Sequence, residues 1–569
     1  MKRNWTAVSN SGPSQGERCA DEAAQSLRAR LEDNFVANNL PASELKRLLT
    51  DAADTGLSSF RHLGHKAKQW SFKNAHRNLL KHCLKDSAWP PLFYSPLELL
   101  DRKTGQTVSK PHPFMLPHEV VCALWKQNGQ VDALKPSQDK HPHFFAHVQK
   151  TASSSGMPAD QCIVLGLHGD GVPFGTQGDS VENLTFNFPA CDQKWVRILF
   201  TTIPKQWAVK GKSMAGALEV LAWSLLHLAL GVHPSTQPNG QPFKEQSRRK
   251  LAGTALPCRG LLCEVRADWQ WLKQCLHIPA WNESKGICYL CKATVANYKD
   301  LSEAAPWRSQ PVSPEVFHHA AALQGDPVCP LFHLPGCDVG IIALDWLHNC
   351  DAGVNADLAG NALLDLVDSY GQGNRKTRCS AVWLLLQDLY HQNNVKDRMN
   401  ELKPELFLQP KKAPKLRCKA AVSRALAPLL PQLLRSAWPA QSPHQRVVLA
   451  AATSMAECYA VLNNWDPAKL DHHSRRCAKL LVSLEIEAQE LNPGTRRWRI
   501  KPKLHAWLEL CSRMCATKGN PREYWVYADE SLGGVLRNIA ELRGGENSAR
   551  RIAENMLWRF QRKFKLPLL

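Results

Sequence analysis

The chain has 569 residues, of which 44% are hydrophobic, and its 71 lysines and arginines outnumber its 51 aspartates and glutamates to give a formal net charge of +20. This length and apolar content allow two to four domains with sizeable cores and exclude a largely disordered chain. The basic balance favours nucleic acid or another polyanion as the partner.

The cysteine content and the N-terminus indicate a reducing intracellular compartment. There are nineteen cysteines, and the polar N-terminus lacks the apolar core of a signal peptide. We therefore expect thiols that are free, buried or metal-bound rather than disulfide-linked. The most apolar segment, 214–230, has helical spacing, lies between Ser213 and Gly231, and contains Glu219 and His227. It predicts a buried amphipathic helix and no membrane contact.

The first part of the chain is predicted to be a disordered tail over residues 1–20, followed by a helical, basic region over 21–155. Within the region, residues 61–85 carry seven basic residues and no acid, with Trp70 inside the run. A solvated helix face is the plain interpretation, and contact with DNA phosphates is the functional one. The residues that we expect to bind DNA here are Lys66, Lys68, Lys73, Arg77 and Lys81.

Periodicity changes near residue 160, and we predict the first part of an RNase H-like core over 156–291. Apolar or alternating runs at 162–167, 183–188 and 195–203 predict three strands in a meander. The helix 213–230 and a fourth strand at 260–266 follow, and that strand could lie parallel to the first after a helical crossover. This order predicts an α/β domain with a mixed sheet and flanking helices.

The rest of the chain is predicted to be a large all-helical insertion over 292–495, the last part of the RNase H-like core with its catalytic helix over 496–545, and a basic tail over 546–569. Basic runs in these segments are further candidates for DNA contact, and Trp498 could stack on an unpaired base. The candidates are Lys411, Lys412, Arg496, Arg497 and Arg499, with Arg559, Arg562, Lys563 and Lys565 in the tail.

Three acids are candidate ligands of a catalytic metal. Asp170 follows the first predicted strand between two glycines, Asp268 ends the fourth, and Glu530 lies on a C-terminal helix. If the first and fourth strands are neighbours, Asp170 and Asp268 meet at their tips, and a helix across the sheet could add Glu530. Carboxylates held together suit a site for two Mg²⁺ or Mn²⁺ ions.

Each acid also has a plainer interpretation. Asp170 could be a turn residue, Asp268 could cap the helix that follows it, and Glu530 could lie on a solvated helix face. Asp529 competes with Glu530 for the third position. Asp345, in the sequence Asp345-Trp-Leu-His348, is an alternative second acid.

Cys288 and Cys291 have the spacing of one half of a zinc site. His505 is a distant candidate ligand, and Glu509 lies one helical turn further on. Two buried free thiols are the plain alternative. Local competitors for the remaining zinc positions are His318, His319, Cys329, His333 and Cys337.

These motifs together resemble the CACTA-type DDE transposases of the CMC superfamily, and more distantly the catalytic core of the V(D)J recombinase. The resemblance covers roughly residues 160–540 and rests on the order of an Asp-Gly after a strand, an Asp before a CxxC, an Asp-x-x-His, a Lys-Pro-Lys-x-His and a terminal Tyr-x-x-Glu. It implies catalytic Asp170, Asp268 and Glu530 with Mg²⁺ or Mn²⁺. It also implies structural zinc on Cys288, Cys291 and His505.

Glu509 departs from the family pattern, which tends to place a histidine there, although a glutamate carboxylate can also bind zinc. A protein of this class would cleave double-stranded DNA at transposon ends, join it to a target, act as a homo-oligomer and reside in the nucleus. The rival hypotheses are a catalytically inactive, transposase-derived DNA-binding protein and an unrelated helical interaction protein whose acids lie apart.

Overall fold

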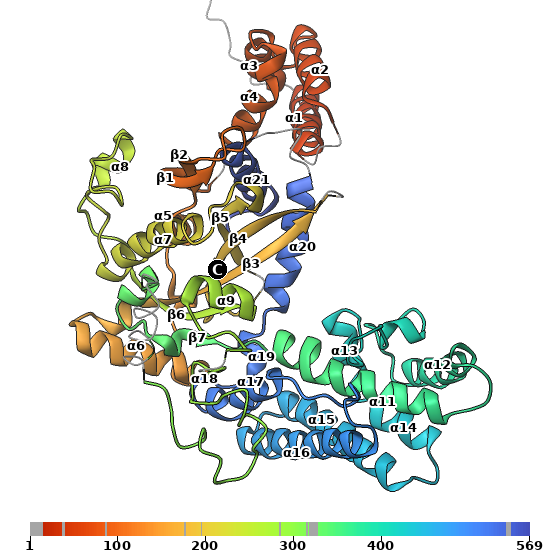
Figure 1. Ribbon diagram of the computed structural model, residues 1–569. Coiled ribbons are helices and arrows are strands. Elements are labelled where there is room, and N and C mark those ends of the chain that lie inside the picture. The colour runs from red at the N-terminus through yellow and green to blue at the C-terminus, as the bar shows by residue number, and fades with distance from the viewer. Residues whose placement is uncertain are drawn as a thin grey trace, which may run out of the picture.

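The computed structural model describes residues 15–36, 40–85, 88–175, 178–194, 196–283, 286–313, 317, 328–541 and 548–569 (Figure 1). At its centre is a mixed five-stranded sheet in the order β5-β4-β3-β6-β7. The strands are β3 (Cys162–Phe174), β4 (Asp179–Asn187), β5 (Arg197–Pro204), β6 (Arg259–Ala267) and β7 (Ile342–Ala343).

The sheet confirms the expected meander and the parallel fourth strand. β3, β4 and β5 pair antiparallel in succession, whereas β6 pairs parallel to β3 and β7 parallel to β6. A register shift follows Leu165, where a Cβ added at Gly166 would lie 2.6 Å from Asn187 Oδ1. Only glycine therefore fits at this point of the central strand.

Helices cover both faces of the sheet. α7 (Ser213–Leu230) packs against β6 and β5, and its Leu228 shares a face of the sheet with Leu165. α20 (Tyr527–Glu541) crosses β3 on the face of Asp170 and Val172, which alternate with the residues facing α7. α9 (Trp269–Leu276) follows β6, and α8 (Gln246–Leu251) precedes it.

α7 has the bounds that the sequence predicts. It is the one described helix long and apolar enough to cross a membrane by length and composition alone. Ten of its residues are buried, and it packs against the sheet, β1 (Phe93–Leu100) and α5 (Pro117–Asn128). The packing is that of a core helix.

The N-terminal region forms a helical unit with a core of its own, made by α1 (Gln15–Val36), α2 (Ala42–Asp54), α3 (Ser58–Lys68) and α4 (Phe72–Lys85). The predicted tail is too long, because α1 begins at Gln15; residues 1–14 lie outside the described part of the chain.

The region predicted as helical over 21–155 also contains strands, since an antiparallel hairpin of β1 (Phe93–Leu100) and β2 (Thr107–Phe114) precedes α5 (Pro117–Asn128) and α6 (Pro142–Ser155). Prolines in both strands hide this hairpin in the sequence. Pro96 and Pro111 face each other in a two-stranded sheet, where neither needs an amide donor.

The predicted helical insertion begins too early. The described residues 293–313 and 328–345 form loops and short 3-10 turns together with β7, which joins the sheet beside β6. The helical part starts with a π-helical segment, Leu347–Val354. It continues with α11 (Asn355–Ser369), α12 (Arg375–Gln392), α13 (Ala420–Leu426), α14 (Leu430–Ala437), α15 (Pro443–Asn463) and α16 (Pro467–Leu491).

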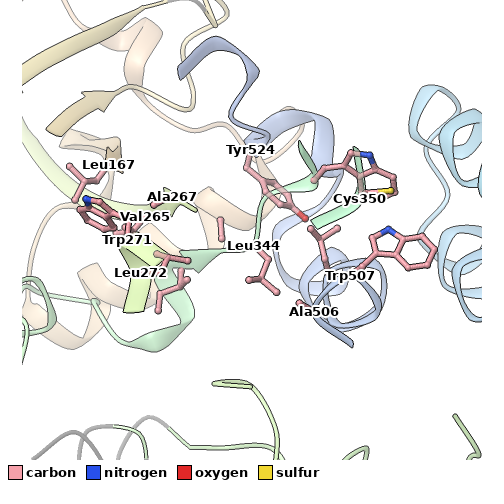
Figure 2. Packing of buried hydrophobic residues seen from close by; sticks show 14 of the residues in the cluster. Leu167, Val265, Ala267, Trp271, Leu272, Leu344, Cys350, Ala506, Trp507 and Tyr524 are labelled. Atoms are coloured by element: carbon pink, nitrogen blue, oxygen red, sulfur yellow. The ribbon is translucent and has the colours of Figure 1, made fainter. Parts of the chain in front are cut away.

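A continuous core joins this helical part to the sheet. Figure 2 shows Leu167 of β3, Val265 of β6 and Trp271 of α9 at one end, Leu344 between, and Trp507 at the other. Trp507 belongs to α17 (Lys503–Glu509), which a second π-helical segment (Leu510–Met514), α18 (Cys515–Lys518) and α19 (Pro521–Tyr524) follow. The elements before α20 are therefore fixed to both parts of the molecule.

The predicted basic tail is instead a packed helix, α21 (Ala549–Lys563), which lies against β5 and α4. Ile552, Met556 and Phe560 are buried on one face at helical spacing. Arg559 is also buried and donates to the carbonyl of Val36. The charged residues of this segment conceal an amphipathic pattern.

Candidate active site and cysteine–histidine cluster

Asp170 and Asp268 lie on neighbouring parallel strands. The last pair in register between β3 and β6 is Gly169 with Ala267, so Asp170 and Asp268 are the next residues along each strand. β3 continues past Asp170 and pairs it with Asn183 of β4. The interpretation of Asp170 as a turn residue is therefore wrong.

Asp268 has the capping role that the sequence suggested. Its Oδ1 accepts a hydrogen bond of 2.6 Å from the backbone N–H of Trp271, at the first turn of α9. No other hydrogen bond to the Asp268 carboxylate comes from the described residues, so its second oxygen is available to a ligand.

Glu530 reaches the same edge of the sheet from α20. This helix crosses β3 so closely that a Cβ added at Gly533 would lie 3.8 Å from Asp170 Oδ2. Glu530 lies one turn before Gly533, and its side chain is 38% exposed. The structure thus brings the three predicted acids to one edge of the sheet.

The three acids share one electrostatic environment. Burial, followed by the negative charges of Glu530 and Asp268, raises the pKa of Asp170 to about 7. Burial also raises the pKa of Glu530, with Asp268 among the acids that add to the effect. Carboxylates that raise one another's pKa form a site that favours a cation. Among the described residues, however, the carboxylate oxygens of the three acids do not all lie within 4.8 Å of one another, as the ligand atoms of the cysteine–histidine cluster below do.

Asp345, the alternative second acid, is fully buried and already has several donors. It accepts hydrogen bonds from the backbone N–H groups of Leu347, His348 and Val526 at 2.7 to 3.1 Å, and Nδ1 of His348 lies 2.7 Å from its Oδ2. These contacts, chiefly those with His348, hold its pKa below the ordinary value despite burial. Asp345 therefore joins the π-helical segment to the residue that precedes α20.

His348 connects Asp345 to Glu530. Its Nε2 lies 3.6 Å from Glu530 Oε1. Although burial opposes protonation, Asp345 and Glu530 raise the pKa of His348 to about 9. The imidazolium is therefore the main form at neutral pH, with Nδ1 facing the carboxylate of Asp345 and Nε2 facing that of Glu530.

Asp529, the competitor of Glu530, is a buried structural residue. Its Oδ1 lies 2.6 Å from Arg197 Nε of β5, and its Oδ2 lies 3.4 Å from Arg266 Nη2 of β6. Burial alone would raise its pKa, yet the guanidiniums of Arg266 and Arg197 lower the pKa of Asp529 to about 2. This ion-pair group fixes α20 to the sheet beside Glu530.

The two glycines around Asp170 have packing roles. A Cβ at Gly169 would lie 2.0 Å from the Trp271 indole, and a Cβ at Gly171 would lie 3.0 Å from Glu182 Oε1. Close approach of α9 and of β4 explains both residues.

A cleft of about 280 Å³, the acid cleft, lies beside Asp268. Its lining includes Asp345, His348 and Lys503, whose Nζ donates to the His348 carbonyl at 2.9 Å. With Lys273, which also lines it, the acid cleft therefore places two acids beside three cationic side chains. Such a surface can bind a cation together with an anion such as a phosphate.

Cys288, Cys291 and His505 form the second candidate site. Their ligand atoms lie within 4.8 Å of one another, and all three residues are buried. Cys291 Sγ is 3.2 Å from His505 Nε2, which is 3.7 Å from Glu509 Oε1. Zinc bonds of about 2.0–2.3 Å in a tetrahedron imply ligand separations of roughly 3.3–3.8 Å. The donors of these three residues fit zinc. Glu509 lies beside His505, but its carboxylate is outside the group of atoms that lie within 4.8 Å of one another, and it also pairs with Arg513 at 3.3 Å.

The local competitors for this site are not part of the cluster. Cys329, His333 and Cys337 lie outside the group, and Cys337 instead donates to the carbonyl of Leu262. His318 and His319 lie outside the described residues. A hydrogen bond with Cys288, together with burial, raises the pKa of the Cys291 thiol, so a metal would have to displace its proton.

The predicted DNA-binding residues divide into two groups. Lys68 pairs with Asp54 at 2.5 Å, Lys66 is exposed on α3, and the side chains of Lys73, Arg77 and Lys81 lie outside the described part. Lys411, Lys412, Arg496 and Arg499 line one cavity, whereas Arg497 pairs with Asp365 and Asp368.

Two of the expected nucleic-acid contacts are wrong. Trp498 is buried and its indole donates to Asp365, so it cannot stack on a base. In the supposed tail, Arg559 is buried. Arg562 pairs with Asp33 at 2.6 Å, and its contact with DNA stays a prediction.

Sequence reasoning missed the residues that support the acids. Arg197 and Arg266 were assigned no role, although Arg266 lies two residues before Asp268 and so on the same face of β6. An arginine inside an otherwise apolar strand was the available signal, because it needs a buried acid as its partner. Glu182 was missed too; it faces Gly171 and pairs with Lys205 at 3.2 Å.

No model of a known protein family matches the chain, and no curated protein matches it in sequence. The chemistry of the two sites therefore carries the functional conclusion by itself.

Proposed function

We propose that this protein is a transposase-like DNA-cleaving and strand-transfer enzyme of the DDE type, built on an RNase H-like core with a large helical insertion. The strand order supports the fold assignment, because a three-strand meander with the fourth strand parallel to the first places Asp170 and Asp268 side by side. The helical part between β7 and α17 corresponds to the insertion.

The observation that carries the proposal is the convergence of Asp170, Asp268 and Glu530. These acids are separated by 98 and 262 residues (268 − 170 and 530 − 268), yet Asp268 and Glu530 both raise the pKa of Asp170. Repulsion within such a cluster destabilises the fold unless a cation is bound, and carboxylates held together suit cation binding.

The donor set fits Mg²⁺ or Mn²⁺, since all three side chains offer carboxylate oxygens and no described group donates a hydrogen bond to Asp170. When bound, a pair of such ions activates a water or 3′-hydroxyl and stabilises the leaving oxygen of a phosphodiester. The protein's own residues do the rest. His348 and Lys503 present positive charge to a DNA phosphate, and Asp345 holds His348 in place.

The proposal includes double-stranded transposon ends and target DNA as substrates, a homo-oligomer on DNA, and action in the nucleus. Structural zinc would be held by Cys288, Cys291 and His505, with Glu509 as fourth ligand. The net charge of +20 supports a polyanionic substrate.

A nicking and strand-transfer assay with Mg²⁺ or Mn²⁺ tests the activity. We expect wild type to nick supercoiled DNA and to lose this activity in Asp170→Ala, Asp268→Ala and Glu530→Gln. Asp192→Ala is the matched control, because Asp192 is 80% exposed and lies in a surface pair with Lys140. Equal nicking by wild type and Asp170→Ala would contradict the proposal.

A catalytically inactive DNA-binding relative is the second candidate. It is favoured by the observation that the three acids are less compact than the cysteine–histidine cluster. Titration calorimetry separates the two, because an active protein takes up Mn²⁺ and Asp170→Ala does not. DNA binding without Mn²⁺ uptake would favour the inactive relative.

A further inference from the structure

A second, larger cleft of about 790 Å³ adjoins the acid cleft, and we call it the basic cleft. Trp269, Trp281, Asn282 and Lys503 line both clefts, so the two lie side by side. Its other walls come from the loop at 411–417, which follows α12, and from the segment 496–503 before α17. Segments far apart in the sequence thus enclose one cavity beside the acids.

The charge of the basic cleft is strongly one-sided. Among the described residues that line it there are eight lysines and arginines and one acid, Asp357, which is already paired with Lys501 at 2.6 Å. Of these basic residues, only Lys501 has a carboxylate partner in the described part of the chain, and four of the others also donate no side-chain hydrogen bond there. They are Lys411, Lys412, Arg496 and Arg499.

The backbone directs these charges into the cleft. Lys411 adopts a left-handed φ of 57°, and Trp498 one of 55°. Such conformations are costly for residues other than glycine, so the surrounding structure must impose them. At Trp498 the turn buries the indole and binds Arg497 to Asp365, while Arg496 and Arg499 remain at the cleft.

An exposed tryptophan lies where the two clefts meet. Trp281 is 55% exposed, which leaves a large apolar ring in water beside a basic surface. The adjacent Trp269 is fixed, because its indole donates to the carbonyl of Pro279 at 3.0 Å. The combination of an open aromatic face with unpaired cations is typical of sites that bind single strands.

We propose that the basic cleft binds an unpaired stretch of nucleic acid, with a nucleobase stacked on Trp281 and phosphates on Lys411, Lys412, Arg496 and Arg499. A duplex keeps its base faces stacked inside, so it cannot offer one to Trp281. An acidic peptide would satisfy the charges and leave the indole without an aromatic partner. The inference rests on the proposed function in one respect: the strand is taken to continue from a phosphate held in the acid cleft.

Fluorescence anisotropy with a labelled twelve-nucleotide oligothymidine, in buffer without Mg²⁺ or Mn²⁺, tests the proposal without any cleavage. We expect Trp281→Ala to weaken binding by roughly 5- to 100-fold and Trp281→Phe to retain most of it. Trp125→Ala is the matched control, because Trp125 is 38% exposed on α5 outside both clefts.

Salt dependence tests the phosphate contacts. Each contact with a single strand adds about 0.7 to the slope of log Kd against log salt, so Lys411→Gln with Lys412→Gln should lower that slope by roughly 1.4. Normal binding by Trp281→Ala would overturn the stacking. Equal competition by a hairpin duplex, or by polyglutamate at matched charge, would overturn the assignment of the ligand as an unpaired strand.

The two proposals fail separately. Asp170→Ala should bind the oligonucleotide as wild type does, because Asp170 is not part of the basic cleft. Nicking that survives Asp170→Ala would sink the proposed function and leave the binding result intact. Unchanged binding by Trp281→Ala would sink the basic cleft and leave the nicking result intact.

Discussion

Asp529 and Glu530 are consecutive in the first turn of α20, yet their carboxylates have different partners. Asp529 is buried against Arg197 and Arg266 of the sheet, whereas Glu530 is partly exposed and lies 3.6 Å from His348. Adjacent residues on a helix point about 100° apart, which allows one acid to fix the helix while the other lies beside His348, a residue that lines the acid cleft. The stability and the chemistry of this turn can therefore be separated by mutation.

Asp529→Asn should destabilise the protein by about 3–5 kcal/mol, because it leaves the buried guanidinium of Arg197 without a carboxylate and leaves Arg266 with Glu264 alone. The measurement is the free energy of unfolding from urea denaturation. Asp192→Asn, which alters an exposed pair, should change it by less than about 0.5 kcal/mol. If both substitutions have the same small effect, Asp529 does not hold α20 on the sheet.

Glu530→Gln should leave stability within about 1 kcal/mol of wild type, because it removes both repulsion by Asp170 and attraction to His348. We expect it to lower metal-dependent nicking by roughly 100-fold or more, since a neutral amide is a poor ligand for Mg²⁺. A gel-based nicking assay and a thermal melt of the same sample check both parts. Loss of nicking accompanied by unfolding would contradict this assignment.

Four strands of the sheet, β3 to β6, could be predicted because each has a clear apolar or alternating pattern in its own sequence. The run Cys162–Leu167 is apolar throughout, as a strand buried on both faces must be, and 213–230 has helical spacing between a serine and a glycine. The hairpin β1–β2 was lost because its prolines imitate a connector, and α21 because its charges conceal a buried face. Such elements can be recognised only together with the part of the fold against which they pack.

The candidate acids could be predicted from the sequence, whereas the residues that hold them in place could not. Asp170 and Asp268 follow from two adjacent strands, which is a topological argument. The choice between Asp529 and Glu530 depends on Arg197, more than three hundred residues away, and no pattern in α20 encodes that partner. Likewise, Trp498 looks like a stacking residue until its indole is seen to bind Asp365.

The cysteine–histidine cluster should hold one zinc ion per chain. Elemental analysis should find it in wild type and not in Cys288→Ser or His505→Ala, whereas Cys379→Ala, at a buried thiol outside the cluster, should retain it. Chelation should lower the thermal midpoint by roughly 5 °C or more, because zinc binds the folded state alone. Glu509→His should keep or tighten the metal. Zinc-free wild type with an unchanged melt would leave the cluster as buried free thiols.

His444 predicts a loss of stability at high pH. Its Nε2 lies 3.0 Å from Asp365 and its Nδ1 2.7 Å from Glu487, and these hydrogen bonds raise the pKa of His444 to about 9. Because the folded pKa lies above the ordinary value of 6.5, the stabilisation is complete below pH 6.5 and disappears as the pH rises through 9. The side chain is about a third exposed, so we expect the charged form to add only about 1 kcal/mol to the free energy of unfolding.

His444→Gln should therefore lower the thermal midpoint at pH 6 by roughly 2–4 °C and have little effect at pH 10. His391→Gln, at an exposed histidine on α12, should behave alike at both pH values, and an equal effect of His444→Gln at both would show that its charge contributes nothing.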